Sequence, residues 1–265
     1  MEILIDGLAF GESPRWHGGR LWLSDWAAGE VLAVDPAAGT REVVARVDAF
    51  PFCLAFDDAG RLLIVTGDGR LLRREDGGAV GPVADLSGLS EHALNELVRA
   101  PDGNLFVNGI GYDMAAGDDP QEGFVAVVAP DGAARRVAEG LAFPNGMEVV
   151  DGGATLLVAE SHASRITAFT IGRDGDLDGR RTWAEVPVSA PDGICVDPQG
   201  GVWYGDVPNQ CAVRVAEGGE ILDRIEADRG CFAVALAPDR TLYLVTMRWG
   251  GEDGERTGQV VTARV

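Results

Sequence analysis

Basic side chains and long apolar runs are both scarce in this chain of 265 residues. Lys and Arg number 22 against 42 Asp and Glu, which gives a formal net charge of −20. Nucleic-acid affinity comes from neutralising phosphates with basic groups, so this charge argues against nucleic-acid partners and against anionic membranes. No apolar run approaches the length of a membrane span, and the opening MEILIDGLAFGE has no basic region followed by a long apolar core. We expect a cytoplasmic protein, a monomer or a small homo-oligomer, whose partner is a small-molecule substrate.

Cysteine and histidine are scarce as well, which limits the kinds of metal site and catalytic motif that the chain can form. The four cysteines, none of them in a C-x-x-C pair, are Cys53, Cys195, Cys211 and Cys231. Three of them lie in apolar strand-like runs, so buried reduced thiols are favoured over disulfides or a thiolate metal site. The three histidines, His17, His92 and His162, lack the spacing of a metal site, and no G-x-S-x-G motif is present. A histidine metal centre and a serine-hydrolase elbow are therefore disfavoured.

Helical periodicity is absent over any useful length, and a β-type unit recurs instead. Each copy has a polar or small residue, an apolar strand, a turn rich in Asp and Gly, and a second apolar strand. The six copies are ESPRWHGGRLWLSD (12–25), CLAFDDAGRLLIVT (53–66), NELVRAPDGNLFVN (95–108), NGMEVVDGGATLLVAE (145–160), DGICVDPQGGVWYGD (192–206) and FAVALAPDRTLYLVT (232–246). Their first residues are 41, 42, 50, 47 and 40 positions apart. Such a period predicts a six-bladed β-propeller with one four-stranded blade per repeat.

The segments between the copies supply the remaining strands. Third strands are expected at 32–36, 70–75, 125–130, 165–171 and 212–217. The opening segment 1–7 has a strand pattern but no place in the first repeat, so we predict that it completes the last blade. No linker or low-complexity segment interrupts the repeats. Residues 1–265 are therefore expected to form a single all-β domain.

Polar residues recur at the leading position of the repeats. In a propeller the innermost strand of each blade lines the central axis, so equivalent positions point toward one another. The six leading residues, with an uncertainty of one position in the second and sixth, are Glu12, Cys53, Asn95, Asn145, Asp192 and Phe232. Taken singly, the polar members are ordinary turn residues, and we expect Asn145-Gly146 to form a turn. In register, four side chains with oxygen donors indicate a shared site on the axis.

The donor set indicates the kind of ion. Two carboxylates, Glu12 and Asp192, and two amides, Asn95 and Asn145, together carry a charge that neutralises one divalent cation. Oxygen-only ligation favours Ca²⁺, with Mg²⁺, Mn²⁺, Zn²⁺ or iron as alternatives. Ligands at one end of an axis leave coordination positions open to water or substrate, as a catalytic metal site requires.

Several short motifs add a family resemblance. FGESPRW (10–16), ALNELV (93–98), FPNGMEVV (143–150) and PDGICVD (191–197) occur in order and at suitable spacings. Together they resemble the markers of the senescence-marker-protein (regucalcin)/gluconolactonase/luciferin-regenerating-enzyme family, from about residue 7 to the C-terminus. The resemblance implies a six-bladed propeller with a divalent metal on the axis and, in many members, lactone hydrolysis. It also implies that Glu12, Asn145 and Asp192 bind the metal, and that Asn95 binds the metal or touches substrate.

Two positions depart from the sugar-lactonase members of that family. Those members commonly have Arg two residues before the first Asn and Asp directly after it, where this chain has Ala93 and Glu96. The missing Arg removes a bidentate donor for sugar hydroxyls, which counts against a simple aldonolactone substrate. The acidic substrate contact expected in that blade falls at Asp113. His162, after the second strand of the Asn145 repeat, is a further candidate substrate contact, with a surface role as the alternative.

These parts predict hydrolysis of a small organic or sugar lactone. A metal-activated water would attack the ester, Asp192 would take the proton as general base, and Asn95 would orient the carbonyl or stabilise the oxyanion. Candidate apolar walls, for most of which core packing is the competing role, are Trp16, Trp26, Phe52, Phe143 and Phe232. Two alternatives stay open: the same metal propeller catalysing an isomerisation or a cyclisation, and a non-catalytic calcium-binding or scaffold propeller.

One segment imitates a calcium loop. DGDLDGRRTWAE (174–185) has Asp174, Asp176, Asp178, Gly179 and Glu185 at EF-hand positions. An EF-hand needs flanking helices, whereas RITAFTI before it and TWAEVPV after it have strand patterns. We expect a hairpin between the outer strands of a blade rather than a second Ca²⁺ site.

Overall fold

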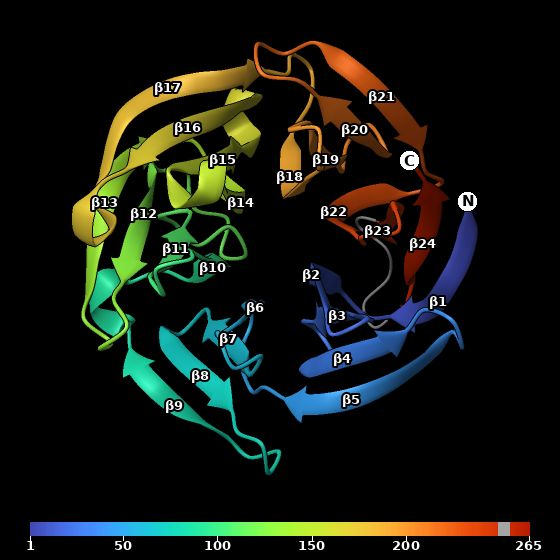
Figure 1. Ribbon diagram of the computed structural model, residues 1–265, viewed down its shortest axis with the longest axis horizontal. Helices are drawn as coiled ribbons and strands as arrows, with labels where there is room; N and C mark the ends of the chain where they lie inside the picture. The colour runs from blue at the N-terminus through green and yellow to red at the C-terminus, as the bar shows by residue number, and fades with distance from the viewer. Residues whose placement is uncertain (249–254) are drawn as a thin grey trace.

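The computed structural model describes residues 1–248 and 255–265, which form a ring of six four-stranded antiparallel sheets (Figure 1). Each sheet is one blade, and its strands follow one another outward from the axis. The innermost strands are β2 (Gly11–His17), β6 (Phe52–Phe56), β10 (Leu94–Arg99), β14 (Pro144–Val150), β18 (Pro191–Val196) and β22 (Gly230–Leu236). All six innermost strands therefore begin at the same end of the ring, which we call the site face; the other end is the far face.

The outer layers repeat the same order in every blade. The second strands are β3 (Arg20–Asp25), β7 (Leu62–Thr66), β11 (Leu105–Gly109), β15 (Thr155–Glu160), β19 (Val202–Asp206) and β23 (Thr241–Met247). The third strands are β4 (Glu30–Asp35), β8 (Arg70–Arg74), β12 (Gly123–Val128), β16 (Arg165–Ile171), β20 (Cys211–Val215) and β24 (Gly258–Arg264). The outermost strands are β5 (Thr40–Arg46), β9 (Val80–Asp85), β13 (Ala134–Leu141), β17 (Leu177–Glu185), β21 (Ile221–Glu226) and β1 (Glu2–Leu8).

The ring is closed by the first strand of the chain. β1 pairs antiparallel with β24, with Ile5 opposite Val260, and the sixth blade has the order β1-β24-β23-β22. The two ends of the chain lie on this blade in Figure 1. The predicted propeller and the predicted use of the N-terminal strand to complete its last blade are both confirmed.

Burial explains why the inner strands are apolar throughout and the outer strands are not. A blade packs against a neighbour on both faces, so its middle strands bury side chains on both sides. In β11, Leu105 and Val107 join the apolar cluster shared with the second blade, while Phe106 between them joins the cluster shared with the fourth. β21, at the rim, reads ILDRIE and is almost wholly exposed.

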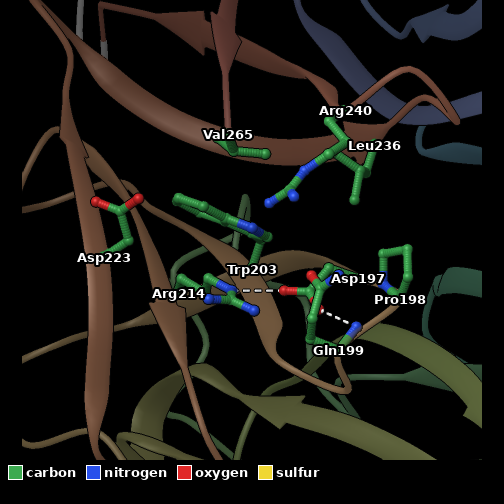
Figure 2. A pocket seen from close by; sticks show the side chains of 9 residues that line it. All are labelled: Asp197, Pro198, Gln199, Trp203, Arg214, Asp223, Leu236, Arg240 and Val265. Carbon is green, nitrogen blue, oxygen red and sulfur yellow. Dashed lines mark hydrogen bonds and ion pairs between the residues drawn. The ribbon is translucent and has the colours of Figure 1, made fainter.

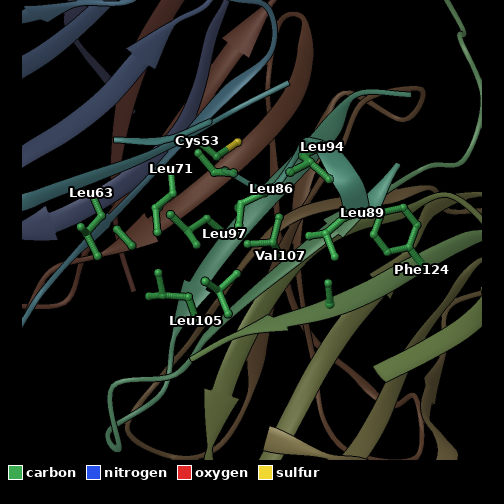
Figure 3. Packing of buried hydrophobic residues seen from close by; sticks show 14 residues of the cluster. Cys53, Leu63, Leu71, Leu86, Leu89, Leu94, Leu97, Leu105, Val107 and Phe124 are labelled. Atoms are coloured by element: carbon green, nitrogen blue, oxygen red, sulfur yellow. The ribbon is translucent and has the colours of Figure 1, made fainter. Parts of the chain in front are cut away.

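The core of the described residues is divided among the blade interfaces. Each of six apolar clusters lies between two adjacent blades. The cluster between the second and third blades, which includes Cys53, Leu97 and Phe124, is shown in Figure 3. Since every blade contributes to two clusters, the position of each inner strand is fixed from both sides.

Two details of the sequence prediction change. The residue of the sixth blade in register with Glu12 is Cys231, the second residue of β22, and not Phe232. The segment 174–185 lacks flanking helices, because β16 and β17 flank a short 3₁₀ turn, η4 (Arg173–Gly175), and Asp176 pairs with Arg135 at 2.8 Å. The hairpin expected there is confirmed. No helix among the described residues is long and apolar enough to cross a membrane.

Candidate metal centre and active site

The four predicted ligands occupy the same place in four different blades. Glu12, Asn95, Asn145 and Asp192 are each the second residue of an innermost strand, namely β2, β10, β14 and β18. The equivalent residues of the two remaining blades are buried cysteines, Cys53 and Cys231. Oxygen donors therefore come from three consecutive blades, the third to the fifth, and from the first blade, which has a cysteine blade on each side of it.

The strand pairing is irregular, as in a β-bulge, at or directly after each of the four residues. The pairing of the innermost strand with its neighbour shifts between Glu12 and Arg15, between Leu94 and Glu96, between Pro144 and Met147, and between Pro191 and Ile194. The strand of Cys53 pairs without any shift, whereas the strand of Cys231 has a shift between Cys231 and Ala233. A bulge bends a strand locally and re-aims its side chains, and bulges are common beside functional sites.

The expected Asn145-Gly146 turn is wrong. Both residues lie within β14, and Gly146 has no left-handed backbone angle. A Cβ at Gly146 would lie 2.6 Å from the Asp192 carbonyl oxygen, and one at Gly193 would lie 2.4 Å from the Cβ of Ala233. The glycines that follow Asn145 and Asp192 are thus required by the close approach of neighbouring inner strands, which brings these two predicted ligands of adjacent blades together.

Three buried carboxylates hold the segments that lead into the ligand strands. Asp25 accepts hydrogen bonds from the backbone N–H groups of Ala9 and Phe10, at 3.0 and 2.7 Å. Glu160 accepts one from the N–H of Ala142 at 2.8 Å. Asp206, the equivalent residue of the Asp192 blade, accepts a longer one from the N–H of Ala190 at 3.5 Å. We call Asp25, Glu160 and Asp206 the anchor carboxylates.

The two ligand carboxylates lie in an environment that penalises negative charge. Burial raises the pKa of Glu12 well above its ordinary value, and the nearby carboxylates of Asp192 and Glu96 raise it further. Burial and the Glu96 carboxylate likewise raise the pKa of Asp192, although Asp192 accepts hydrogen bonds from the Gly193 N–H and from the Asn145 side chain. Two carboxylates in this condition require either protons or a cation.

The amide side chains complete a donor set that fits a divalent cation. The Asn95 Nδ2 donates to the Pro144 carbonyl and the Asn145 Nδ2 to the Ser161 hydroxyl, both at 3.4 Å. Neither amide oxygen accepts a hydrogen bond from the described part of the chain, so both Oδ1 atoms remain available as acceptors. No group of three or more His, Cys, Asp and Glu among the described residues could hold a metal ion. The candidate centre therefore depends on the two amides, and its oxygen-only chemistry fits a hard cation.

The Glu96 side chain is bound to Arg15, which lies on the far-face side of the four predicted ligands. Its Oε1 accepts a hydrogen bond from the Arg15 Nη2 at 2.9 Å and another from the Leu97 N–H at 2.8 Å. Arg15 also donates to the carbonyl oxygens of Pro14 and Leu97. The side chain that departs from the sugar-lactonase pattern is thus used to neutralise Arg15 inside the ring.

The two predicted substrate contacts lie in loops of the site face. Asp113, in the β11–β12 loop, is exposed, and its Oδ1 accepts a hydrogen bond from the Ala116 N–H at 3.0 Å. His162, in η3 (Ser161–Ala163), lies with its ring centroid 4.5 Å from that of Phe143, and burial lowers its pKa. Nothing in the described contacts joins Asp113 to the four ligands, whereas His162 directly follows Ser161, which contacts Asn145.

Only part of the predicted apolar wall lies at the site face. Phe52 is wholly buried in the core between the first two blades, and Trp16 stacks on Tyr243 between the first and sixth blades. Phe52 is therefore a core residue, and Trp16 lies toward the far face, where it lines a cavity; neither lies at the site face. Trp26 and Phe143 lie in site-face loops, and Phe232 packs against Phe10 at 5.5 Å.

The far face holds two cavities of different size. The larger, of about 480 Å³, is lined by residues at the ends of the inner strands, among them Arg15, Glu148 and Cys195. The smaller, of about 40 Å³, lies between the fifth and sixth blades, where Arg214 pairs with Asp197 (Figure 2). The buried Trp203 Nε1 lines it and has no hydrogen-bond partner among the described residues, and one or two ordered waters are the occupants that such a volume allows.

Several residues that shape the site were not singled out from the sequence. The anchor carboxylates have a visible signal, because the repeats of Glu12, Asn145 and Asp192 end in Asp25, Glu160 and Asp206. Asn108, wholly buried, has a weaker one: it ends the Asn95 repeat, accepts from the Glu96 N–H and donates to the Asn145 carbonyl. No signal in the sequence identifies Arg15, because its partner Glu96 is distant in the chain.

Comparison with known proteins agrees with this architecture. Residues 10–248 match the model of the SMP-30/Gluconolactonase/LRE-like region. Among solved structures, a gluconolactonase from Xanthomonas campestris has a TM-score of 0.79 and 26% identity, covering 98% of this chain and 88% of that one. A calcium-binding protein, regucalcin, from Agrobacterium tumefaciens has a TM-score of 0.83 and 20% identity, with 98% and 92% covered. A luciferin-regenerating enzyme has a TM-score of 0.85 and 17% identity, with 100% and 94% covered.

Proposed function

Because the chain belongs to the SMP-30/Gluconolactonase/LRE-like family, we propose that it is a divalent-metal-dependent hydrolase that opens a lactone. The observation that carries the proposal is the cluster of Glu12, Asn95, Asn145 and Asp192 on the site face, with two carboxylates whose pKa values are raised by burial. A scaffold propeller has no need of such a cluster, because uncompensated buried carboxylates destabilise the fold.

The four oxygen-bearing side chains would hold the cation, with Ca²⁺ the favoured ion. A divalent cation bound there supplies Lewis acidity toward an ester carbonyl and stabilises negative charge that develops on its oxygen. Asn95, whose amide makes only a long contact with Pro144, can turn its Nδ2 toward the same oxygen.

Asp192 is the proposed general base. It removes a proton from the attacking water as the water oxygen bonds to the acyl carbon, and it returns that proton to the ring oxygen when the acyl carbon–oxygen bond breaks. One lactone and one water thus give one hydroxy acid, with no other reactant. The Asn145 amide donates to Asp192 and orients the carboxylate. Asp113 and His162 remain the proposed substrate contacts.

The first experiment measures metal content and activity together. Elemental analysis of the purified protein is followed by a pH-indicator screen of lactones with and without chelator. Glu12→Ala and Asp192→Ala should each abolish metal-dependent hydrolysis while circular dichroism shows a retained fold. Asp131→Ala, at an exposed turn of the far face, is the matched control. Full activity in either ligand variant, or hydrolysis indifferent to chelator, would exclude the mechanism.

A further inference from the structure

The side chains around the candidate centre indicate what kind of lactone it takes, if the proposed lactonase activity is correct. One aromatic group lies where the first, second and sixth blades meet. Phe10 lies 5.1 Å from Trp26, 6.0 Å from Phe50 and 5.5 Å from Phe232 between ring centroids, and Trp26 lies 5.4 Å from Phe50. Phe10 is two residues before Glu12, and Phe232 directly follows Cys231, so this group lies where the innermost strands of these blades begin, at the site face.

A second aromatic group stands at the third and fourth blades. Phe143 lies 6.2 Å from Tyr112 and 4.5 Å from His162 between ring centroids. Phe143 is two residues before Asn145, the same offset that Phe10 has from Glu12. In the third blade this offset falls on Ala93. Aromatic rings thus flank the ligands at the very offset where the sugar-lactonase pattern has an arginine.

The loops of the site face also expose apolar side chains. Phe50, Met114 and Val188 are 56%, 50% and 92% exposed and belong to three different site-face loops. Among the described residues, the other large apolar side chains that are exposed lie on outermost strands or at Met1. Phe143 and Val188 have φ angles of +57° and +61°, which a bulky or β-branched residue rarely adopts. Backbone strain of this kind often marks a functional site, although Arg240 has a φ of +68° in a turn of the far face.

Polar recognition of sugar hydroxyls is weak at the same place. Arg229, which has the Ala93 offset in the sixth blade, is bound to Asp228 through two contacts of 2.8 and 2.6 Å and donates to the Thr257 carbonyl. Glu96 is held by Arg15. The chain has no lysine, and one divalent cation only balances Glu12 and Asp192. Neither Arg229 nor Glu96 is therefore free to bind sugar hydroxyls, and the centre has no spare positive charge for an anionic substrate.

We propose that the site takes a neutral lactone that carries an apolar substituent, an alkyl chain or an aromatic ring, in preference to a polyhydroxylated aldonolactone. The ester lies over Glu12, Asn95, Asn145 and Asp192. The substituent lies against the aromatic groups of Phe10 and Phe143 and reaches the rim at Phe50, Met114 and Val188. Burial of apolar area, rather than hydrogen bonding, selects this substrate.

The test compares three six-membered lactones that differ only in substituents: δ-valerolactone, δ-decalactone with a pentyl chain, and glucono-1,5-lactone. We expect kcat/KM for δ-decalactone to exceed that for δ-valerolactone by at least about tenfold, because each buried methylene strengthens binding. Glucono-1,5-lactone should be the poorest of the three. A preference for glucono-1,5-lactone, or equal values for the other two, would overturn the inference and leave the lactonase intact. Hydrolysis of none of the three with Ca²⁺, Mg²⁺, Mn²⁺ or Zn²⁺ would refute the proposed function itself.

Variants locate the preference on the site face. Phe50→Ser should lower the δ-decalactone to δ-valerolactone ratio by about three- to tenfold, and Met114→Ser should lower it by a smaller factor. Ile221→Ser, on the outermost strand β21 and 63% exposed, is the matched control and should leave the ratio unchanged. A ratio that falls equally in the control, or not at all in Phe50→Ser, would show that the preference does not come from this rim.

Discussion

The two ends of the ring axis treat buried carboxylates in opposite ways. Toward the far face, Glu96 is paired with Arg15, and the arginine also binds two backbone carbonyls, so the charges compensate one another. At the site face, Glu12 accepts a hydrogen bond from the Ser13 N–H, and Asp192 accepts hydrogen bonds from the Gly193 N–H and the Asn145 amide. Among the described residues, no cationic side chain pairs with either carboxylate. The innermost strands therefore carry a neutralised pair of charges toward the far face and two carboxylates without a cationic partner at the site face.

This difference in charge compensation distinguishes residues that stabilise the ring from residues that serve the proposed function. A buried ion pair that is fully hydrogen-bonded costs the fold little, while a buried charge left alone is strongly unfavourable. With the divalent cation that we propose, the two ends of the axis would become electrostatically alike.

The largest effect is expected from breaking the compensated end. Arg15→Met would leave Glu96 buried without its partner and should lower the free energy of unfolding by about 3–5 kcal/mol in urea denaturation. The double variant Arg15→Met/Glu96→Gln is the matched control, since it removes both charges and should recover much of the loss. A single variant as stable as the parent would mean that the Arg15–Glu96 pair does not hold the axis together.

At the site face, removing a charge should have the opposite sign. In metal-free protein, Asp192→Asn keeps an acceptor for the Gly193 N–H but removes one of two repelling carboxylates, so unfolding should become harder by about 1–2 kcal/mol. In the presence of Ca²⁺ the order should reverse, because the variant loses ligand charge. Calorimetric scans with and without Ca²⁺ measure both. A variant less stable than the parent without metal would contradict the comparison.

Glu148 offers a pH-dependent test inside the larger far-face cavity. Burial raises its pKa from 4.5 to about 7, with Arg15 lowering it and Glu96 raising it. The folded state therefore holds a proton that the unfolded state releases, and the stability this proton provides is present below about pH 4.5 and lost as pH rises through 7. Glu148→Gln should raise stability by about 1–3 kcal/mol at pH 8, less if water in the cavity screens the charge, and by little at pH 4.5. Equal effects at both values would exclude the shift.

The smallest effect concerns backbone strain at the site face. Val188 has φ +61° and is 92% exposed, so Val188→Asn should relieve strain without loss of core packing. Asn visits the left-handed region far more readily than Val, and we expect a gain of about 0.5–1 kcal/mol. Val83→Asn, on the outermost strand β9 and 41% exposed, is the control and should gain nothing. Equal shifts in melting temperature would show that Val188 is not strained.

The sequence predicts the parts of this molecule that repeat. The register of Glu12, Asn95, Asn145 and Asp192 could be read because one blade follows another at a nearly constant period. The Asn145-Gly146 turn was wrong because dipeptide preference ignores the neighbouring strand, whose approach is what demands Gly146. The Arg15–Glu96 pair could not be predicted at all, since it joins residues 81 positions apart that only the closed ring brings together.

The pairing of β1 with β24 has a consequence beyond closure of the ring. Without β1, the sixth blade would end in β24, whose sequence GQVVTAR would present a row of open backbone donors and acceptors. An open edge of this kind recruits strands from other molecules, which is how sheets polymerise. The first eight residues thus replace that regular edge with β1, whose pairing is interrupted by two bulges, and a bulged edge is a poorer template for strands of other molecules.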